Sequence, residues 1–349
     1  MQNEPFKMSE TNPPTEYSAV RDGGAGAIDL SARGRLLISG SEAVMFLNGL
    51  ITNDMKTLAV NSWMPAVFPN VQGRLLAAVR SIHREDGFLI DTERATLATV
   101  LKLLERFTLA GDFHVTDLTS ETAMLSIQGK NSDEVILKTI GETVMNRHAV
   151  VIAQLESGAK VTIIRATHTA EDGFDLFISA NESGSLHDSL TRAGAQPVGA
   201  DVLETLRIEA GIPRFGLDMD ETNVVTETNL DDAVSFTKGC YIGQEIIARI
   251  KYRGHVAKKL TGLILENEVA LESGAKIFSA DDKEIGRVTS LTFSPRFKRT
   301  IALGYVKYDY LEPGTNVSVV STAEKLPATV AVLPFIRGSW YSDLAPSGA

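Results

Sequence analysis

One short segment combines residue types that can do chemistry, Lys238-Gly239-Cys240-Tyr241-Ile242-Gly243-Gln244-Glu245. It holds the only cysteine among 349 residues, and its glycines let the backbone approach a partner closely. The ammonium group of Lys238 would favour the thiolate form of Cys240. A free cysteine is also among the residue types most often buried in a core. Spacing alone therefore leaves two interpretations open, a presented thiol and a core side chain.

Composition restricts the other chemistry. A single cysteine cannot form an intrachain disulfide or a multi-cysteine metal site, and it fits a reducing cytoplasm. The histidines lack the spacing of zinc ligands, so we expect no metal site. The net charge of −10 argues against broad nucleic-acid binding, and we expect no direct nucleic-acid partner. The chain lacks a P-loop and the GxGxxG, HExxH and GxSxG motifs.

The chain also shows no targeting or membrane signal. Its first residues lack the basic region and apolar block of a signal peptide, and no run of about 18 apolar residues occurs. We therefore expect a cytoplasmic protein that does not associate with a membrane.

Three further side chains are candidates for ligand binding. Glu171 lies at the tip of a predicted hairpin, Arg207 could pair with a ligand carboxylate, and Tyr241 could stack on a flat ring. Each has a plainer interpretation as a turn residue, a solvent-facing arginine or a core aromatic, and spacing alone favours it. A basic cluster follows the cysteine segment, and it could hold phosphate, a polyglutamate tail or RNA, or be a solvated face: Arg249, Lys251, Arg253, His255, Lys258 and Lys259.

The elements that must position these residues follow from periodicity. Asp-Gly turns between apolar runs predict two hairpins, with turns at Glu85-Asp86-Gly87 and Glu171-Asp172-Gly173. Ser41 and Thr92 are predicted to cap helices. The repeated Glu-Asp-Gly-Phe turn suggests two related α+β modules, although a common turn type explains much of the likeness.

Polarity and hydrophobic patterning divide the chain into three parts. Residues 1–25 are polar and predict a flexible tail. Residues 26–255 predict an α+β core, and residues 256–349 show short alternating runs separated by turn residues, typical of a small antiparallel barrel.

The segment 238–245, together with Ala248-Arg249 and Arg253-Gly254, resembles the signature of the YgfZ family. These are folate-binding proteins linked to iron–sulfur cluster maturation, within the superfamily of the glycine-cleavage T-protein, an aminomethyltransferase. Five other segments resemble that superfamily: 27–31, 46–54, 169–174, 206–213 and 302–306.

The resemblance implies an α+β fold, a T-protein-like folate-binding core of two interleaved subdomains with a C-terminal antiparallel β-barrel. It implies tetrahydrofolate or another reduced folate as cofactor, with Glu171 holding the pterin edge and Arg207 contacting the same ligand. It also implies iron–sulfur client proteins as partners, including enzymes that modify tRNA. Cys240 and Lys238 are then the candidate catalytic pair. The candidate folate-binding residues are Glu171, Arg207, Tyr241, Gly239, Gly243 and Gln244.

Two departures from the T-protein pattern matter. Ala77 and Ala78 stand where the aminomethyltransferases carry an acid on the first hairpin, and His168 stands where they commonly have tyrosine. The expected function is therefore help in iron–sulfur cluster assembly or repair, with Cys240 as a presented thiol. The alternatives are a glycine-cleavage-type aminomethyltransferase and a folate-independent docking scaffold.

Overall fold

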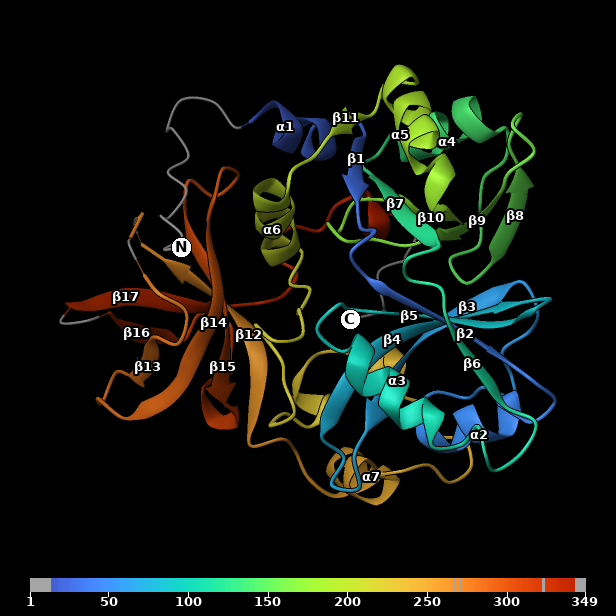
Figure 1. Ribbon diagram of the computed structural model, residues 1–349. Coiled ribbons are helices and arrows are strands. Elements are labelled where there is room, and N and C mark those ends of the chain that lie inside the picture. Colours follow the sequence, from blue (N-terminus) through green and yellow to red (C-terminus); the bar gives the residue numbers. More distant parts are fainter. Residues whose placement is uncertain (1–13, 267, 270, 322–323, 343–349) are drawn as a thin grey trace.

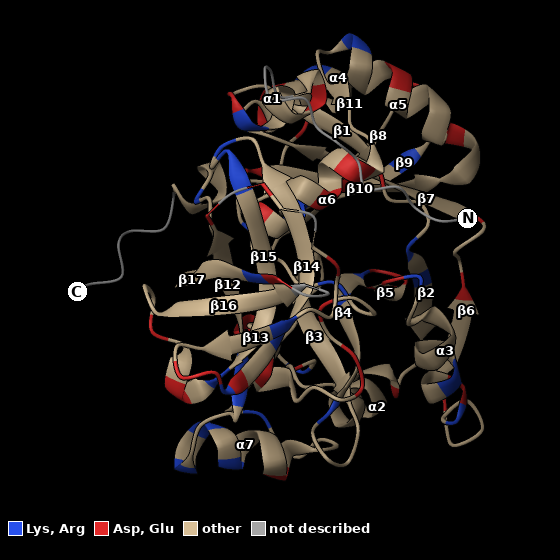
Figure 2. Ribbon diagram, turned by 90° about the vertical axis from the view of Figure 1, so that its left-hand side faces the viewer, with Lys and Arg blue, Asp and Glu red and all other residues tan. Residues whose placement is uncertain are grey.

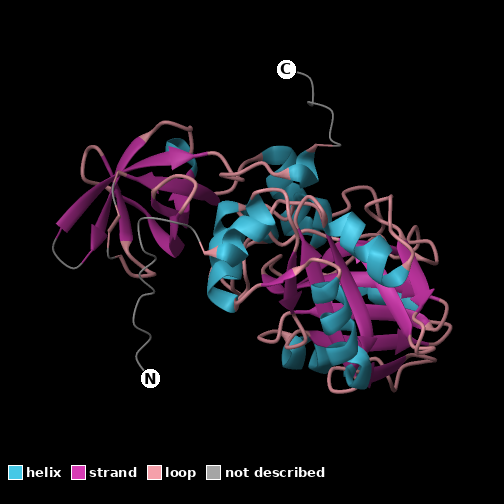
Figure 3. Cartoon of the chain, turned by 90° about the horizontal axis from the view of Figure 1, so that it is seen from above, coloured by secondary structure: helices cyan, strands magenta, loops and turns pink. Residues whose placement is uncertain are grey.

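The computed structural model describes residues 14–266, 268–269, 271–321 and 324–342. Two α+β modules and a β-barrel make up this part of the chain, with the barrel set to one side of the modules (Figure 1). The same separation is visible from above (Figure 3). The predicted fold class, an α+β core followed by a small antiparallel barrel, is confirmed.

The first module is a five-stranded sheet in the order β3-β4-β5-β2-β6, with two helices. Its elements are β2 (Gly34–Ser39), α2 (Ala43–Leu50), β3 (Ser62–Pro69), β4 (Leu75–Arg84), β5 (Gly87–Thr92), α3 (Leu97–Glu105) and β6 (His114–Asp117). The β4–β5 hairpin turns at Gly87, whose φ of 131° favours glycine. The predicted Asp-Gly hairpin is thus confirmed.

The second module is a six-stranded sheet in the order β11-β1-β7-β10-β9-β8. Its elements are β1 (Gly26–Asp29), β7 (Thr122–Gln128), α4 (Ser132–Ile140), β8 (Val150–Gln154), β9 (Lys160–Arg165), β10 (Gly173–Ser179), α5 (Ser183–Arg192) and β11 (Gln196–Pro197). The order β8-β9-β10-β7 repeats the order β3-β4-β5-β2 of the first module. In each of these four-stranded sets, one helix follows the strand that comes first in the sequence and another follows the strand that comes last. Because β1 precedes the first module in sequence but pairs with β7, the two modules are interleaved.

Both predicted helix caps are wrong. Helix α2 begins at Ala43, and the hydroxyl of Ser41 donates instead to Asp112 Oδ2 at 2.7 Å. Helix α3 begins only at Leu97, and Thr92 ends strand β5. Thr92 is paired with Gly34 and Val79 in the sheet, whereas Ser41 lies beyond the end of β2 and donates both its N–H and its hydroxyl to Asp112.

The segment predicted as a flexible tail, 1–25, contains a packed helix. Helix α1 (Thr15–Arg21) buries Tyr17 and Val20, and the Tyr17 hydroxyl donates to Glu209 Oε1 at 2.9 Å. Tyrosine and valine spaced three residues apart give this short helix an apolar side. The prediction fails for these residues, and residues 1–13 lie outside the described part.

Helix α6 (Ala200–Glu209) connects the second module to the rest of the chain and packs against the barrel. A long loop with two short 3₁₀ turns follows and leads to helix α7 (Gln244–Arg253). Figure 1 shows α7 at the lower edge of the molecule, whereas the second module lies at the top.

The barrel closes in the order β12-β15-β14-β13-β16-β17. Its strands are β12 (Lys258–Leu265), β13 (Lys276–Ser279), β14 (Glu284–Ser294), β15 (Arg299–Lys307), β16 (Asn316–Ser321) and β17 (Glu324–Ala331). The described chain after β17 leaves the barrel and returns to the core, where Ser339–Tyr341 form a 3₁₀ turn. The barrel is therefore shorter than the predicted unit 256–349.

Candidate functional site

A central cleft of about 670 Å³ lies where the two modules, the barrel and the returning C-terminal segment meet. Its volume is in the range of small-molecule sites. The first module contributes Arg33, Trp63, Ala78, Arg80 and Glu93, and the second contributes Ala166, Thr167 and His168. Further lining comes from the loop 210–233, from Leu260 and Thr261 of β12, and from the C-terminal residues Leu333, Pro334, Trp340 and Tyr341.

A chain of ion pairs runs along one wall of this cleft. Arg33 donates from Nε and Nη2 to Asp91, each at 2.8 Å, and Arg80 Nε donates to the same carboxylate at 2.8 Å. Arg80 also pairs with Asp175, and His168 Nε2 lies 3.0 Å from Asp175 Oδ2. This chain of ion pairs links the two modules, since Arg80 belongs to β4 and Asp175 to β10.

Neighbouring positive charges keep the two aspartates of this chain of ion pairs ionised. Burial alone would raise the pKa of Asp91, but Arg33 and Arg80 outweigh it and hold that pKa below its usual range. Burial also opposes ionisation of Asp175, whose pKa His168 and Arg80 nevertheless lower strongly. Both carboxylates are fully buried and stay charged because they are paired.

Two other acids of the cleft behave in the opposite way. Burial raises the pKa of Glu93 and that of Asp232. Such groups are poised to hold or release a proton nearer neutral pH than an exposed carboxyl group.

Both tryptophans of the chain, Trp63 and Trp340, line the cleft. The guanidinium of Arg80 lies 6.0 Å from the Trp63 ring and that of Arg147 lies 4.1 Å from the Trp340 ring. Indole rings offer flat apolar faces on which a heterocycle can stack.

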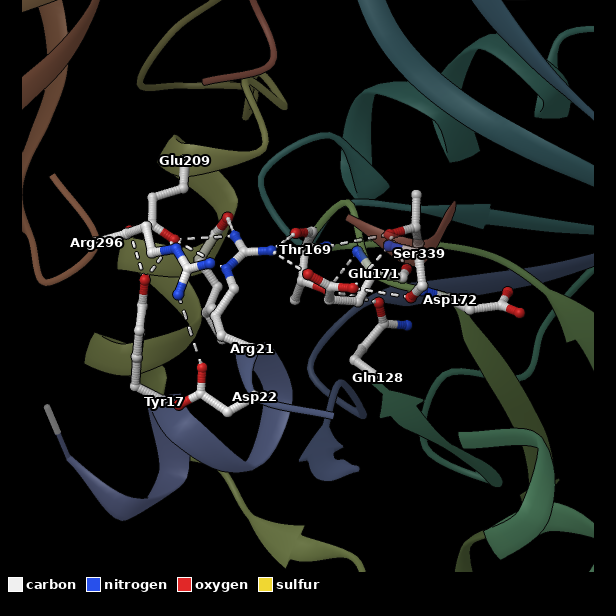
Figure 4. Close-up of polar contacts among 12 residues, drawn as sticks. Tyr17, Arg21, Asp22, Gln128, Thr169, Glu171, Asp172, Glu209, Arg296 and Ser339 are labelled. Atoms are coloured by element: carbon white, nitrogen blue, oxygen red, sulfur yellow. Dashed lines mark hydrogen bonds and ion pairs between the residues drawn. The ribbon is translucent and has the colours of Figure 1, made fainter. Parts of the chain in front are cut away.

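The predicted pterin ligand Glu171 lies just behind the C-terminal segment. Arg21 Nη1 donates to Glu171 Oε1 at 3.0 Å, and the Ser339 N–H and hydroxyl both donate to Oε2 at 2.8 Å (Figure 4). Arg21 also pairs with Glu209 at 2.9 Å, so it bridges two acids. Glu171 is thus buried in an internal network, and it is not among the cleft-lining residues.

Arg207 lies at the junction with the barrel. It pairs with Glu204 and Asp218, donates to the carbonyl of Ile212 at 2.6 Å, and donates to the hydroxyl of Ser290 on β14 at 2.9 Å. These partners occupy the donors of its planar fork and tie α6 to the barrel. Neither Arg207 nor Glu171 is among the residues that line the cleft, so the structure does not bring them together on a ligand there.

The cysteine segment lies away from the cleft. Cys240 is exposed, which favours the presented thiol over the core side chain. Lys238 is buried, and its Nζ donates to the carbonyls of Asn48, Ile51 and Asn53 at 2.7, 3.0 and 2.6 Å. Burial lowers its pKa to about 8. All three N–H groups are used on the end of α2, so Lys238 has a structural role, and its catalytic role stays a prediction.

The neighbours of Cys240 have mixed environments. Tyr241 is buried in an apolar cluster with Leu75 and Ile247, whereas a Cβ at Gly239 would face open space. Gly243 has a φ of 76°, and a Cβ there would lie 2.3 Å from the Asn70 carbonyl oxygen. Gln244 opens α7. These residues shape the entrance to α7 and do not line the cleft, so their folate-binding role stays a prediction.

The basic cluster follows the second half of α7 and the start of β12. Arg249, Lys251 and Arg253 are exposed, and Figure 2 shows basic residues along α7. In the described part of the chain no helix is long and apolar enough to span a membrane. The same part holds no cluster of three or more histidine, cysteine or acidic side chains suited to a metal ion.

Sequence reasoning missed most of the cleft wall. Arg33, Arg80, Glu93 and Trp340 carry no motif, and only the departure at His168 and the alanines at 77 and 78 pointed toward this region. Strand alternation would not have separated cleft residues from core residues here, because Ala78, Val79 and Arg80 are consecutive on β4 and all three line the cleft.

Comparison with known proteins agrees with this architecture. Residues 6–238 match the GCVT N-terminal domain, and residues 258–336 match the glycine cleavage T-protein C-terminal barrel domain. The chain therefore belongs to the glycine-cleavage T-protein family. The segment 239–257, with Cys240 and helix α7, lies between the two matched regions.

Similar proteins cover nearly the whole chain. An aminomethyltransferase of Rubrobacter xylanophilus is 30% identical over 92% of this chain and 86% of its own length. One of Herpetosiphon aurantiacus is 28% identical over 93% and 90%. The crystal structure of glycine cleavage system aminomethyltransferase T from Bartonella henselae has a TM-score of 0.84 at 23% identity, covering 92% of this chain and 89% of that one, so the fold is shared.

Proposed function

We propose that this protein binds a reduced folate, tetrahydrofolate or a derivative, in the central cleft and lacks full aminomethyltransferase chemistry. The observation that carries this proposal is the pairing of a ligand-sized cleft with Ala78 on its wall, where the resemblance places an acid in the transferases. Ala77, the other candidate position, is fully buried. The cleft keeps what a flat heterocycle needs, namely indole faces and polar groups.

The finer part of the proposal concerns Cys240. Its exposed thiol offers a soft ligand for iron, which suits a protein that assists iron–sulfur cluster assembly or repair in client enzymes. Support comes from exposure and from the resemblance of 238–245 to the YgfZ signature. The thiol acts outside the cleft in this account, and the folate site and the thiol are separate features of one molecule.

A complementation experiment tests the role of the thiol. In cells lacking the protein, Cys240→Ser should fail to restore the activity of iron–sulfur client enzymes, because serine is a poor ligand for iron. The purified variant should bind tetrahydrofolate like wild type, because Cys240 does not line the cleft. Full restoration of client activity by Cys240→Ser would remove the thiol from the mechanism.

A second candidate is aminomethyl transfer, the activity in the names of the similar proteins. The raised pKa values of Glu93 and Asp232 favour it, because either acid could handle a proton in place of the missing one. Incubation with tetrahydrofolate and an aminomethyl-lipoyl donor separates the two candidates. Catalytic formation of methylene-tetrahydrofolate that is lost in Glu93→Gln would establish the second and overturn the first.

A further inference from the structure

The cleft holds a histidine whose orientation is fixed from behind. The side chain of His168 is 21% exposed, and it lines the cleft while its Nε2 lies 3.1 and 3.0 Å from the two oxygens of Asp175. Asp175 is fully buried and is also paired with Arg80 of β4. The imidazole is thus held between the second module and the cleft by a carboxylate that cannot turn toward solvent.

This arrangement determines which ring nitrogen carries the proton. Asp175 stays a carboxylate, because it is paired with the permanently charged guanidinium of Arg80. A carboxylate only accepts hydrogen bonds, so Nε2 must carry the hydrogen. In neutral His168 the other nitrogen, Nδ1, therefore has a free lone pair. Within the described residues no group hydrogen-bonds to Nδ1.

The cleft needs such an acceptor. Pterin-type heterocycles present N–H and amino donors along one edge, and a buried donor without a partner costs free energy. Glu171, the acceptor that the resemblance suggests, already receives hydrogen bonds from Arg21 and Ser339. His168 is a cleft-lining group whose neutral ring has an acceptor still available.

We propose that His168 binds the folate directly, with Nδ1 accepting a hydrogen bond from an N–H group of the ligand's heterocycle. This inference rests on the proposed function and names a binding residue for it. It also gives a reason for the histidine. The imidazole supplies a hydrogen-bond acceptor for the ligand, because the carboxylate of Glu171 already accepts from Arg21 and Ser339.

The test is the affinity for tetrahydrofolate, followed by quenching of the fluorescence of Trp63 and Trp340. His168→Phe should raise Kd about 10-fold, the usual effect of one lost hydrogen bond at a buried site. His168→Gln should recover much of that loss, because its amide oxygen also accepts. His114→Phe is the matched control: His114 pairs with Asp112 at 3.0 Å on the exposed surface and should leave Kd unchanged.

A second readout does not depend on variants that must fold. In wild-type protein with ¹⁵N-labelled histidine, the Nδ1 signal of His168 should shift when tetrahydrofolate is added. An unshifted signal, or an unchanged Kd in a folded His168→Phe, overturns the inference while folate binding stands. Absence of binding by wild type would instead overturn the proposed function and the inference with it.

Discussion

Glu93 makes the folding stability of the protein depend on pH. Its pKa is raised by burial, so the folded protein holds this proton more tightly than the unfolded chain. Folding stability therefore falls as pH rises from the ordinary glutamate pKa through the raised value. The charged carboxylate remains partly desolvated above that window.

Glu93→Gln removes this charge and keeps an oxygen for the Phe215 N–H, which lies 3.3 Å from Glu93 Oε1. We expect the variant to have a higher free energy of unfolding than wild type at pH 7, with the difference closing at acidic pH, where Glu93 is protonated in both states. Urea unfolding at a series of pH values measures this. A pH-independent difference would contradict the raised pKa.

Lys238 is expected to stabilise the end of helix α2. Lys238→Met keeps the stem but leaves the carbonyls of Asn48, Ile51 and Asn53 without their shared donor. We expect the free energy of unfolding to fall by about 1–3 kcal/mol. Lys56→Met, an exposed lysine nearby, is the control and should change it by less than about 0.5 kcal/mol. Equal stability of the two variants would refute the structural role of Lys238.

At the scale of elements, the C-terminal segment after β17 is part of the core. Ser339 donates twice to Glu171, and Arg147 lies against the Trp340 ring. Helix α1 enters the same region through Arg21, which contacts both Glu171 and Glu209. Two segments from opposite ends of the described chain are thus joined by one buried ionic network.

Glu171→Gln tests this junction. The variant keeps an oxygen for Ser339 but removes the charge facing Arg21, whose side chain is only 3% exposed. We expect the free energy of unfolding to fall by about 1–3 kcal/mol because a buried cation loses one partner. Glu134→Gln breaks an exposed pair with Lys138 and should cost less than about 0.5 kcal/mol. A Glu171→Gln variant as stable as that control would show that the network contributes little.

Element type was predictable where the cause is local. The turn at Glu85-Asp86-Gly87 and the alternating strands of the barrel follow from turn chemistry and period-two patterning. The cap at Thr92 failed because strand pairing extends β5 through that residue. The cap at Ser41 failed because Asp112, 71 positions away, accepts from its N–H and hydroxyl. Helix α1 was missed because its buried side chains find partners far along the chain, as Tyr17 does at Glu209, 192 positions away.

In the whole molecule, the cleft could not be predicted from sequence patterns, because contacts between residues far apart in the sequence create it. Arg80 and Asp175 are separated by 95 positions and meet only when the two modules pack together. Leu260 from the barrel and Trp340 from the C-terminal segment close the same space. The alanines at 77 and 78 could be read from sequence, but only the fold shows that Ala78 faces a ligand-sized cleft.

Calorimetric titration with tetrahydrofolate tests most directly whether this cleft binds a reduced folate. Wild type should bind with one saturable site. Ala78→Trp, which fills the cleft from β4, should lose binding while its melting temperature stays close to that of wild type. Asp188→Trp, at an exposed position on α5, should bind normally. Absence of binding by wild type, or undiminished binding by a folded Ala78→Trp, would contradict the account.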